Sequence, residues 1–413
     1  MDLTETQKQL QKDLRDFAEA HFRKDLMRDT REARFPIDEY QEVARAGYMG
    51  FMVPPEYGGR GGGVTEYCIL LDELARVNHN VAWAIDVTVA VASAIRHLGT
   101  EAQRRRLLPR LMDGSLIPAF ALSDLTGGSS LKQMGTRVTR HTPGGWRLTG
   151  RKTHIHNAEV AQLWLVFAGS EDGHEALLIE GRDLIVIERR YQPFGFRCVP
   201  CNQVLFDGVP VGDEDFLGER GKGLSAAMHG TLNYTRIGNA SIVLGIARAA
   251  LDVAMSFALA RDVGKGLLAQ QQAVQHMIAD AMTRLQAADL LRWRATYLHD
   301  QQRDAVMAAS QAKLFATDTA SEICGSLFRL LGAYGVYEEF PMTDYINSCK
   351  TMELASGASE VHRNNIARLA LAEYERRFEA GELFRWAQTE EQIAMLMSNQ
   401  RSAQVMQRLR QTE

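Results

Sequence analysis

Hydrophobic residues recur at helical spacing over about the first 115 positions of the chain. One amphipathic run follows Leu3-Thr4-Glu5 and reaches about Phe22, and Phe35-Pro36-Ile37-Asp38 opens another. Residues 53–59 then carry the Pro-Pro and Gly-Gly pairs that are typical of a loop. Helical spacing returns in three further segments, at 65–78, 81–98 and 101–112. The pattern predicts an all-helical N-terminal domain over residues 1–116.

The hydrophobic period changes to that of strands in the middle of the chain, over residues 117–224. Short apolar runs of strand length are separated there by Gly, Asp and Pro. These runs lie at 146–149, 163–168, 176–179, 184–187 and 203–206. Short strands at this spacing predict a middle domain that is a small β-barrel or sandwich.

Helical spacing resumes from residue 225. Long amphipathic segments cover 235–259, 270–298 and 304–331, and a final core helix begins near Ser359. We therefore predict an α+β multidomain protein in which a helical domain over 225–380 follows the β domain. Residues 381–413 are polar and rich in Gln and Arg, which predicts an appended helix or tail.

Composition and charge exclude several classes of protein. The chain has 413 residues, is 46% hydrophobic and 24% charged, and carries a net charge of -4, so no basic nucleic-acid footprint is expected. No stretch approaches 18 consecutive apolar residues, and the polar N-terminus does not resemble a signal peptide, so we expect no membrane span. Five irregularly spaced cysteines indicate a reducing, cytoplasmic location.

A metal site is not predicted. The pair Cys198-Val199-Pro200-Cys201 has CxxC spacing, but no second CxxC or HxxxH follows it. His154 and His156 share one strand face and could form a metal pair, although the sequence offers no third ligand within reach.

Several sequence motifs, each weak alone, follow one another with consistent spacing over about residues 1–375. Their order resembles that of the acyl-CoA dehydrogenase family, of which the chain is identified as a divergent member. The motifs are Val53-Pro54-Pro55-Glu56-Tyr57-Gly58-Gly59, Ser123-Asp124-Leu125-Thr126-Gly127-Gly128-Ser129-Ser130, Gly150-Arg151-Lys152-Thr153-His154-Ile155-His156-Asn157-Ala158, Phe216-Leu217-Gly218-Glu219-Arg220-Gly221-Lys222-Gly223, Leu331-Gly332-Ala333-Tyr334-Gly335 and Gly357-Ala358-Ser359-Glu360-Val361-His362-Arg363.

The resemblance implies a helical N-terminal domain, a β-barrel domain and a C-terminal four-helix bundle. It also implies FAD between the barrel and the bundle, with the adenine end reaching a neighbouring subunit of a homodimer or homotetramer. The implied cofactor contacts are Ser123 and His156 at the isoalloxazine, His154 where an aromatic residue usually shields it, Ser129 at the pyrophosphate, Arg261 and Gln272 from the partner subunit, Gly332 and Gly335 at the adenosine half, and Arg329 and Glu360 beside them.

Two of these residues could instead have purely structural roles. Ser129 follows a Gly-Gly pair and could belong to a simple turn. Arg261 could be a cation at the end of a helix, where it would offset the helix dipole.

The catalytic base is where the sequence departs from the family. Most members take a Glu at the position of Ser356, and a smaller branch takes the base at Thr235, immediately before Arg236. A serine is too weak a base to replace a carboxylate unassisted. Glu353 and the imidazole of His156 are candidate replacements, whereas the counterpart of Asp124 in the family points elsewhere. Arg236 and Ser356 remain as implied substrate contacts.

The resemblance implies an FAD-dependent oxidoreductase that acts on an acyl thioester by α,β-dehydrogenation or the reverse reduction. The carrier is expected to be CoA or an acyl carrier protein, with an electron-transfer flavoprotein as a possible partner. Because the usual base is missing, we expect an unusual substrate with an acidic α-proton. A flavin-dependent oxidase or monooxygenase on the same fold, or a non-catalytic relative, are the alternatives.

Overall fold

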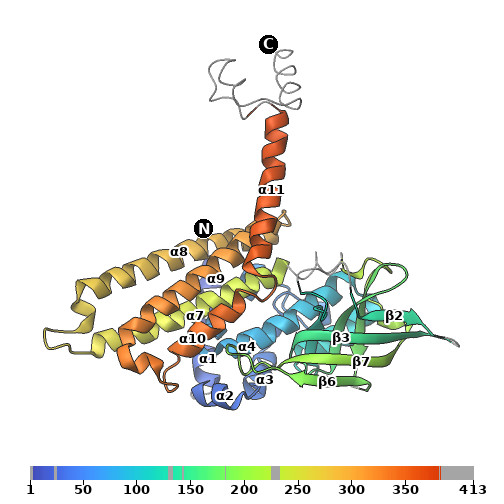
Figure 1. Cartoon of the computed structure of the whole chain (residues 1–413), viewed down its shortest axis with the longest axis horizontal. Coiled ribbons are helices and arrows are strands. Elements are labelled where there is room, and N and C mark those ends of the chain that lie inside the picture. Colours follow the sequence, from blue (N-terminus) through green and yellow to red (C-terminus); the bar gives the residue numbers. More distant parts are fainter. Residues whose placement is uncertain are drawn as a thin grey trace, which may run out of the picture. The chain divides into compact units, whose positions relative to one another are not determined.

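The computed structural model describes residues 3–22, 26–128, 134–141, 144–181, 183–224, 233–380 and 382. It divides the chain into two compact units, Met1–Ser359 and Glu360–Glu413. The first unit contains the predicted N-terminal and middle domains and the predicted C-terminal domain as far as Ser359; the predicted boundaries stay predictions (Figure 1). Ser129 and almost all of the predicted tail over 381–413 lie outside the described residues.

Helices form the N-terminal region, as predicted. The 3₁₀ turns η1 (Tyr48–Gly50) and η2 (Pro55–Tyr57) occupy the loop region before α4. The two helices predicted at 65–78 and 81–98 are one element, α4, which is kinked at Asn78 (φ -148, ψ 96). The helices are α1 (Glu5–His21), α2 (Leu26–Glu32), α3 (Ile37–Arg45), α4 (Val64–Leu98) and α5 (Glu101–Met112), of which α2 was not predicted.

The middle region is a curled seven-stranded sheet in the order β1-β4-β2-β3-β7-β6, with β5 paired to β4. All five predicted strands are present, whereas β1 and β2, with four residues each, were not predicted. Trp164 and Phe206 pack edge to face in the core of the sheet. The strands are β1 (Pro118–Ala121), β2 (Arg137–Arg140), β3 (Trp146–His156), β4 (Leu163–Gly169), β5 (His174–Glu180), β6 (Ile185–Arg190) and β7 (Cys201–Val211).

Four helices that follow the sheet pack against one another and form the predicted C-terminal bundle. They are α7 (Asn233–Ala260), α8 (Gln272–Asp300), α9 (Val306–Phe328) and α10 (Met342–Met352), with the 3₁₀ segments η3 (Asp213–Asp215), η5 (Leu268–Gln270) and η6 (Arg329–Val336). The prediction did not include α10. The last helix, α11 (Ser359–Glu379), belongs almost entirely to the second unit.

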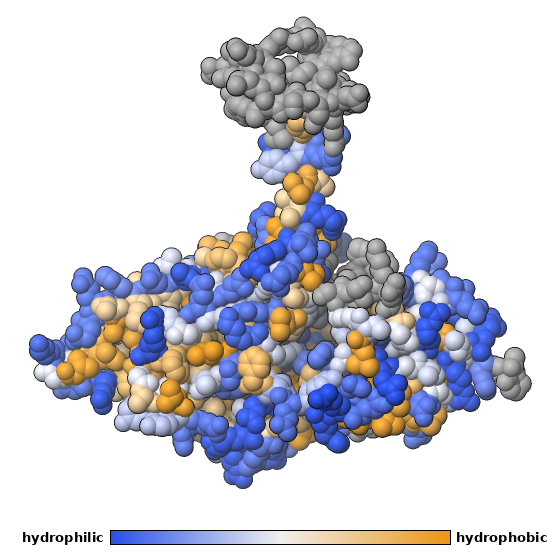
Figure 2. Space-filling model, viewed as in Figure 1, coloured by the Kyte–Doolittle hydropathy of each residue, from blue (hydrophilic) through white to orange (hydrophobic). Residues whose placement is uncertain are grey.

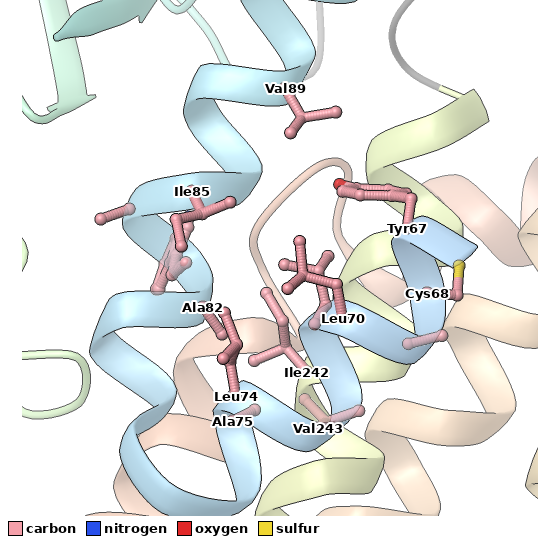
Figure 3. Packing of buried hydrophobic residues seen from close by; sticks show 14 of the residues in the cluster. Tyr67, Cys68, Leu70, Leu74, Ala75, Ala82, Ile85, Val89, Ile242 and Val243 are labelled. Carbon is pink, nitrogen blue, oxygen red and sulfur yellow. The ribbon is translucent and has the colours of Figure 1, made fainter. Parts of the chain in front are cut away.

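Two helices, α4 and α7, combine length with apolar composition. Both are long and apolar enough to span a membrane by length and composition, although neither contains an unbroken apolar run of the length that the sequence criterion required. However, 83% of the tested window of α4 and 56% of that of α7 is buried inside the protein, as in the core helices of soluble proteins. Figure 3 shows Leu70 and Leu74 before the kink of α4, Ile85 after it, and Ile242 and Val243 of α7 in the shared core.

A buried network of charged side chains ties α4, α7 and α8 together. Arg248 Nη1 of α7 and Arg292 Nη1 of α8 both donate to Asp72 of α4, at 2.8 and 2.5 Å. The Nη2 atoms of both arginines donate to Asp289 of α8. Arg292 is fully buried, so its single positive charge needs these carboxylates to offset the loss of water.

We expect Asp72→Asn to destabilise the fold strongly, because it leaves two buried guanidinium groups with one carboxylate between them. Removing one partner of a buried pair costs about 3–5 kcal/mol of unfolding free energy. Urea denaturation provides the measurement. The matched control is Asp252→Asn, which breaks an exposed ion pair between Asp252 of α7 and Arg76 of α4. This change should cost less than about 1 kcal/mol of unfolding free energy. Equal losses in the two variants would contradict this account.

Candidate active site

A buried ion pair connects the end of β1 to β3. Lys152 Nζ lies 2.7 Å from Asp124 Oδ1, and both side chains are buried. Asp124 also accepts hydrogen bonds from the backbone N and the hydroxyl of Thr136, at 3.0 and 2.8 Å. Asp124 therefore holds the strands together and is not available as a catalytic base.

The same junction places Ser123 beside the last residues of β3. The backbone N of Thr153 donates to the carbonyl of Ser123 at 2.9 Å. The pairing of β3 with β7 shifts register between Lys152 and Ile155, and His154 has a positive φ of 56°. This irregularity turns the two histidines apart. His154 is exposed and stacks on Tyr191, with ring centroids 5.3 Å apart.

His156 instead faces the second arm of α4, which is the part of the helix that follows the kink at Asn78. Its ring centroid lies 4.3 Å from that of Trp83, which in turn packs edge to face on Phe196 at 4.1 Å. The backbone N of Phe196 donates to Ser348 Oγ of α10 at 3.1 Å, so the contact extends to the bundle. Trp83 was not predicted as a site residue, since a tryptophan in an apolar helix is usually a core residue.

The imidazole of His156 fits a flavin contact. Its Nδ1 is buried and has no hydrogen-bond partner within the described part of the chain. Burial, helped by the neighbouring His154, lowers its pKa to about 4, so the ring is neutral at pH 7. A neutral imidazole offers one N–H donor and one acceptor nitrogen, and a flavin edge presents complementary groups. Among the described residues, no group of three or more His, Cys, Asp or Glu side chains could hold a metal ion.

The loop that carries Ser356 is held by a buried lysine. Lys313 Nζ of α9 donates to the carbonyls of Glu353 and Gly357, both at 3.0 Å, and Ser356 between them has a positive φ of 52°. The carboxylate of Glu353 accepts hydrogen bonds from Ser321 Oγ at 2.6 Å and Lys350 Nζ at 2.7 Å. These contacts favour a structural role for Glu353, and its role as replacement base stays a prediction.

The first turn of α7 carries the other position at which the family places a base. Thr235 and Arg236 are both buried there, and burial lowers the pKa of Arg236. The two positions to which the resemblance assigns the base, Ser356 and Thr235, thus carry uncharged side chains.

Five of the remaining predicted cofactor residues lie in segments at the other end of α7. Arg261 and Gln272 are exposed at the connection between α7 and α8. Nearby, η6 packs against α7 through Tyr334 and Phe257, whose ring centroids lie 5.8 Å apart. This segment contains Arg329, Gly332 and Gly335; Gly332 has a φ of 56° and open space where a side chain would lie. Glu360 belongs to α11, where it is exposed and pairs with Arg363 at 3.5 Å.

A pocket of about 630 Å³ lies where the two ends of α4 meet the start of α7 and the connection between α8 and α9. His97 Nε2 lies 3.0 Å from both the Tyr234 hydroxyl and Arg96 Nη2, and burial and the charge of Arg96 lower its pKa to about 4. The pocket was not predicted. It is lined by Met52, Gly62, Gly63, Val64, Arg96, His97, Tyr234, His299, Asp300, Gln302, Arg303, Asp304, Ala305 and Val306.

A buried carboxylate on α4 was also missed. Asp86 lies one helical turn after Trp83, and its two oxygens accept hydrogen bonds from the Tyr67 hydroxyl and from Asn239 Nδ2 of α7, the latter at 3.1 Å. Burial raises the pKa of Asp86 to about 7, although both hydrogen bonds oppose the rise. A lone Asp within an apolar helix gives no signal of this kind in the sequence.

Three family models match consecutive parts of the chain. They describe the N-terminal, middle and C-terminal domains of acyl-CoA dehydrogenases and match residues 4–115, 119–209 and 221–371. The chain belongs to the acyl-CoA dehydrogenase family. The predicted family, fold, FAD cofactor and class of flavin-dependent oxidoreductase on acyl thioesters are thereby confirmed.

Relatives within the acyl-CoA dehydrogenase family match over nearly their whole length. Benzylmalonyl-CoA dehydrogenase of Aromatoleum aromaticum is 32% identical, over 89% of this chain and 98% of its own. The subunit CarC of the caffeyl-CoA reductase-Etf complex of Acetobacterium woodii is 30% identical, over 90% and 100%. The structure of butyryl-CoA dehydrogenase from Megasphaera elsdenii, 28% identical, covers 90% of this chain and 99% of its own with a TM-score of 0.86.

We expect His156 to make the fold sensitive to acid. A histidine whose pKa falls from 6.5 to about 4 on folding binds fewer protons in the native state, so its contribution to stability is present above pH 6.5 and is lost as the pH falls toward 4. His156→Gln should therefore lose less stability than the wild type across that range in denaturant titrations. The control is His141→Gln, which removes an exposed imidazole. A parallel decline in the wild type and His156→Gln would contradict the assignment.

Proposed function

We propose that the protein catalyses the α,β-dehydrogenation of an acyl-CoA, or the reverse reduction, at the site around His156. The observation that carries the proposal is the buried Nδ1 of His156, which lacks a partner and lies where the resemblance puts a flavin contact. Bound FAD supplies the hydride acceptor for this chemistry. Ser123 and His156 would hold its ring edge, and Trp83 and Phe196 exclude water from that side.

The missing base narrows the substrate. Ser356 and Thr235 cannot remove an ordinary α-proton from a thioester, because their hydroxyls are very weak bases. The substrate should therefore carry an α-carbon that is more acidic than that of a simple fatty acid. The name of the benzylmalonyl-CoA relative supports this choice, since the α-carbon of a malonyl group lies between two carbonyls.

The pocket beside the start of α7 is the proposed entry for the carrier arm. Arg96 and Arg303 line it, and the pKa of both His97 and His299 is lowered, so these imidazoles stay neutral and carry no charge of their own. Asp300 is already engaged, because it accepts hydrogen bonds from the backbone of Val64 at 2.7 Å and the hydroxyl of Thr65 at 2.5 Å at the start of α4. Asp304 also lines the pocket and accepts a hydrogen bond from the backbone N of Val306 at 3.0 Å, so the two carboxylates balance the two arginines in charge. Arg96 and Arg303 would therefore bind the phosphates of a CoA or a phosphopantetheine arm as directed donors.

The electron acceptor is proposed to be an electron-transfer flavoprotein. The name of the CarC relative places that protein in a complex with an Etf. An enzyme that is reduced by acyl-CoA and reoxidised faster by oxygen than by an electron-transfer flavoprotein would instead favour the oxidase alternative.

A homodimer or homotetramer is the expected assembly. The end of the bundle with Arg261 and Gln272 also exposes apolar side chains, and Figure 2 shows apolar residues over the bundle. These side chains are Leu259, Val263, Tyr334, Val336 and Tyr337, each between 44% and 59% exposed. Light scattering at micromolar concentration should give a mass of two or four chains, and a monomeric mass would contradict the assembly.

Restoring a carboxylate at Ser356 tests the proposed reaction. Ser356→Glu should raise the rate at which a simple saturated acyl-CoA reduces the flavin, because general-base assistance contributes ~10²–10⁴-fold when the geometry is good. Anaerobic stopped-flow absorbance measures this rate. Ser356→Gln is the matched control, since it has the same shape without the carboxylate and should give no gain.

Two results would count against the proposal. If Ser356→Glu binds FAD and acyl-CoA but reduces the flavin no faster than Ser356→Gln, the loop held by Lys313 does not face the α-carbon. If neither the variants nor the wild type is reduced by any thioester, the site does not carry out this chemistry.

A further inference from the structure

The cluster around Asp86 contains more hydrogen-bond acceptors than donors. Its donors are the Tyr67 hydroxyl and the two N–H groups of Asn239 Nδ2, of which the hydroxyl and one N–H donate to Asp86. Its acceptors are the two oxygens of Asp86, each with further capacity, and Asn239 Oδ1, which is buried without a partner. Among the described residues, no cation lies within ion-pair distance of Asp86. Asp86, Tyr67 and Asn239 are between 1% and 3% exposed, so bulk water does not reach the acceptors that lack a donor.

The surrounding chain is shaped to admit this carboxylate. Gly238 of α7 faces it: a side chain there would begin 2.5 Å from both Asp86 Oδ1 and the Tyr67 oxygen. In Figure 3 the hydroxyl of Tyr67 points from the start of α4 toward the arm that follows the kink. Because burial raises the pKa of Asp86 to about 7, the group is partly protonated at neutral pH, and a ligand that donates to it would favour the charged carboxylate.

Asp86 lies next to the reacting centre of the proposed function. Trp83, three residues earlier on the same helix, contacts the ring of His156. On α7, Asn239 is four residues after Thr235 and therefore shares its face. Asp86 is thus about one helical turn from Trp83, which contacts His156, and its partner Asn239 is about one helical turn from Thr235.

The packed contact between α4 and α7, named the seam below, extends from Asp86 to the helix ends that line the pocket. Asp86, Ala90, Ser93 and His97 follow one another at 4-, 3- and 4-residue intervals and lie on one face of α4. His97 meets Tyr234 of α7 at the pocket, about 16 Å from Asp86 at the rise of an α-helix. The small side chains of Ala90 and Ser93 border the seam between its two ends.

We propose that Asp86, Tyr67 and Asn239 form a recognition site for a hydrogen-bond donor, an ammonium or a hydroxyl group, on the acyl part of the substrate. The proposal rests on the proposed function, because it takes the thioester arm to enter at the pocket and the acyl part to follow the seam. An ammonium would pair with the carboxylate, and a hydroxyl would donate to it or to Asn239 Oδ1. A plain hydrocarbon would leave all these acceptors unpaired, which a site built for a donor discriminates against.

The test compares three acyl-CoA thioesters that share the same acidified α-carbon, over a range of chain lengths: a saturated chain, the same chain with a hydroxyl end, and the same chain with an ammonium end. Each is titrated into wild type, Asp86→Asn and Asp86→Leu, with Asp280→Asn on the exposed face of α8 as the matched control. The measured quantities are kcat/KM for anaerobic flavin reduction and the thermal shift that each thioester produces. Asp86→Asn keeps the shape of the side chain and so remains informative if Asp86→Leu does not fold.

In the wild type, a donor-bearing chain should exceed the saturated chain by about tenfold or more in kcat/KM and give the larger thermal shift. Asp86→Asn should lose the preference for ammonium, and Asp86→Leu should prefer the saturated chain, with the change in KM rather than kcat. Asp280→Asn should match the wild type.

Two outcomes would be decisive against the recognition site, and a third would separate it from the proposed function. Equal responses to the three chains in wild type and Asp86→Asn would overturn it. A fall in kcat by the same factor for all three chains would assign Asp86 to proton transfer instead. If no thioester reduces the flavin, the proposed function fails, while the thermal shifts still decide whether Asp86 selects a donor.

Discussion

The packing of α4 against α7 is the interaction on which the rest of the structure depends. α4 turns at Asn78, so that its first arm carries Asp72 and Tyr67 while its second arm carries Trp83 and Asp86. The Asp72 network fixes the first arm to α7 and α8. Because both arms belong to one helix, fixing the first also sets where the second meets α7 and the end of β3.

Two buried cations then position the loops that carry chemistry. Lys152 ties the end of β1 to β3 and so sets Ser123 beside the histidines. Lys313 holds the carbonyls on either side of Ser356. In both places a lysine is buried with defined acceptors, which makes the local backbone rigid even though the side chains at the reacting positions are unusual for the family.

The sequence predicted the elements with strong periodicity and missed those with little of it. The long helices and the five apolar strands were found, but β1 and β2 have four residues each, which is too short for a pattern. The candidate site residues were assigned through motifs in one order, and they stay predictions. The partners of Glu353 on α9 and α10 could not be predicted, because they depend on tertiary packing. Asp86 escaped notice because its partners Tyr67 and Asn239 are 19 and 153 positions away along the chain.

Anaerobic titration of the FAD-loaded protein with acyl-CoA thioesters, followed by flavin absorbance and product analysis, tests the central claim most directly. The account requires that at least one thioester with an acidified α-carbon bleaches the flavin and yields the α,β-unsaturated product. A flavin that stays oxidised with every thioester, in a protein that binds both FAD and acyl-CoA, would contradict it.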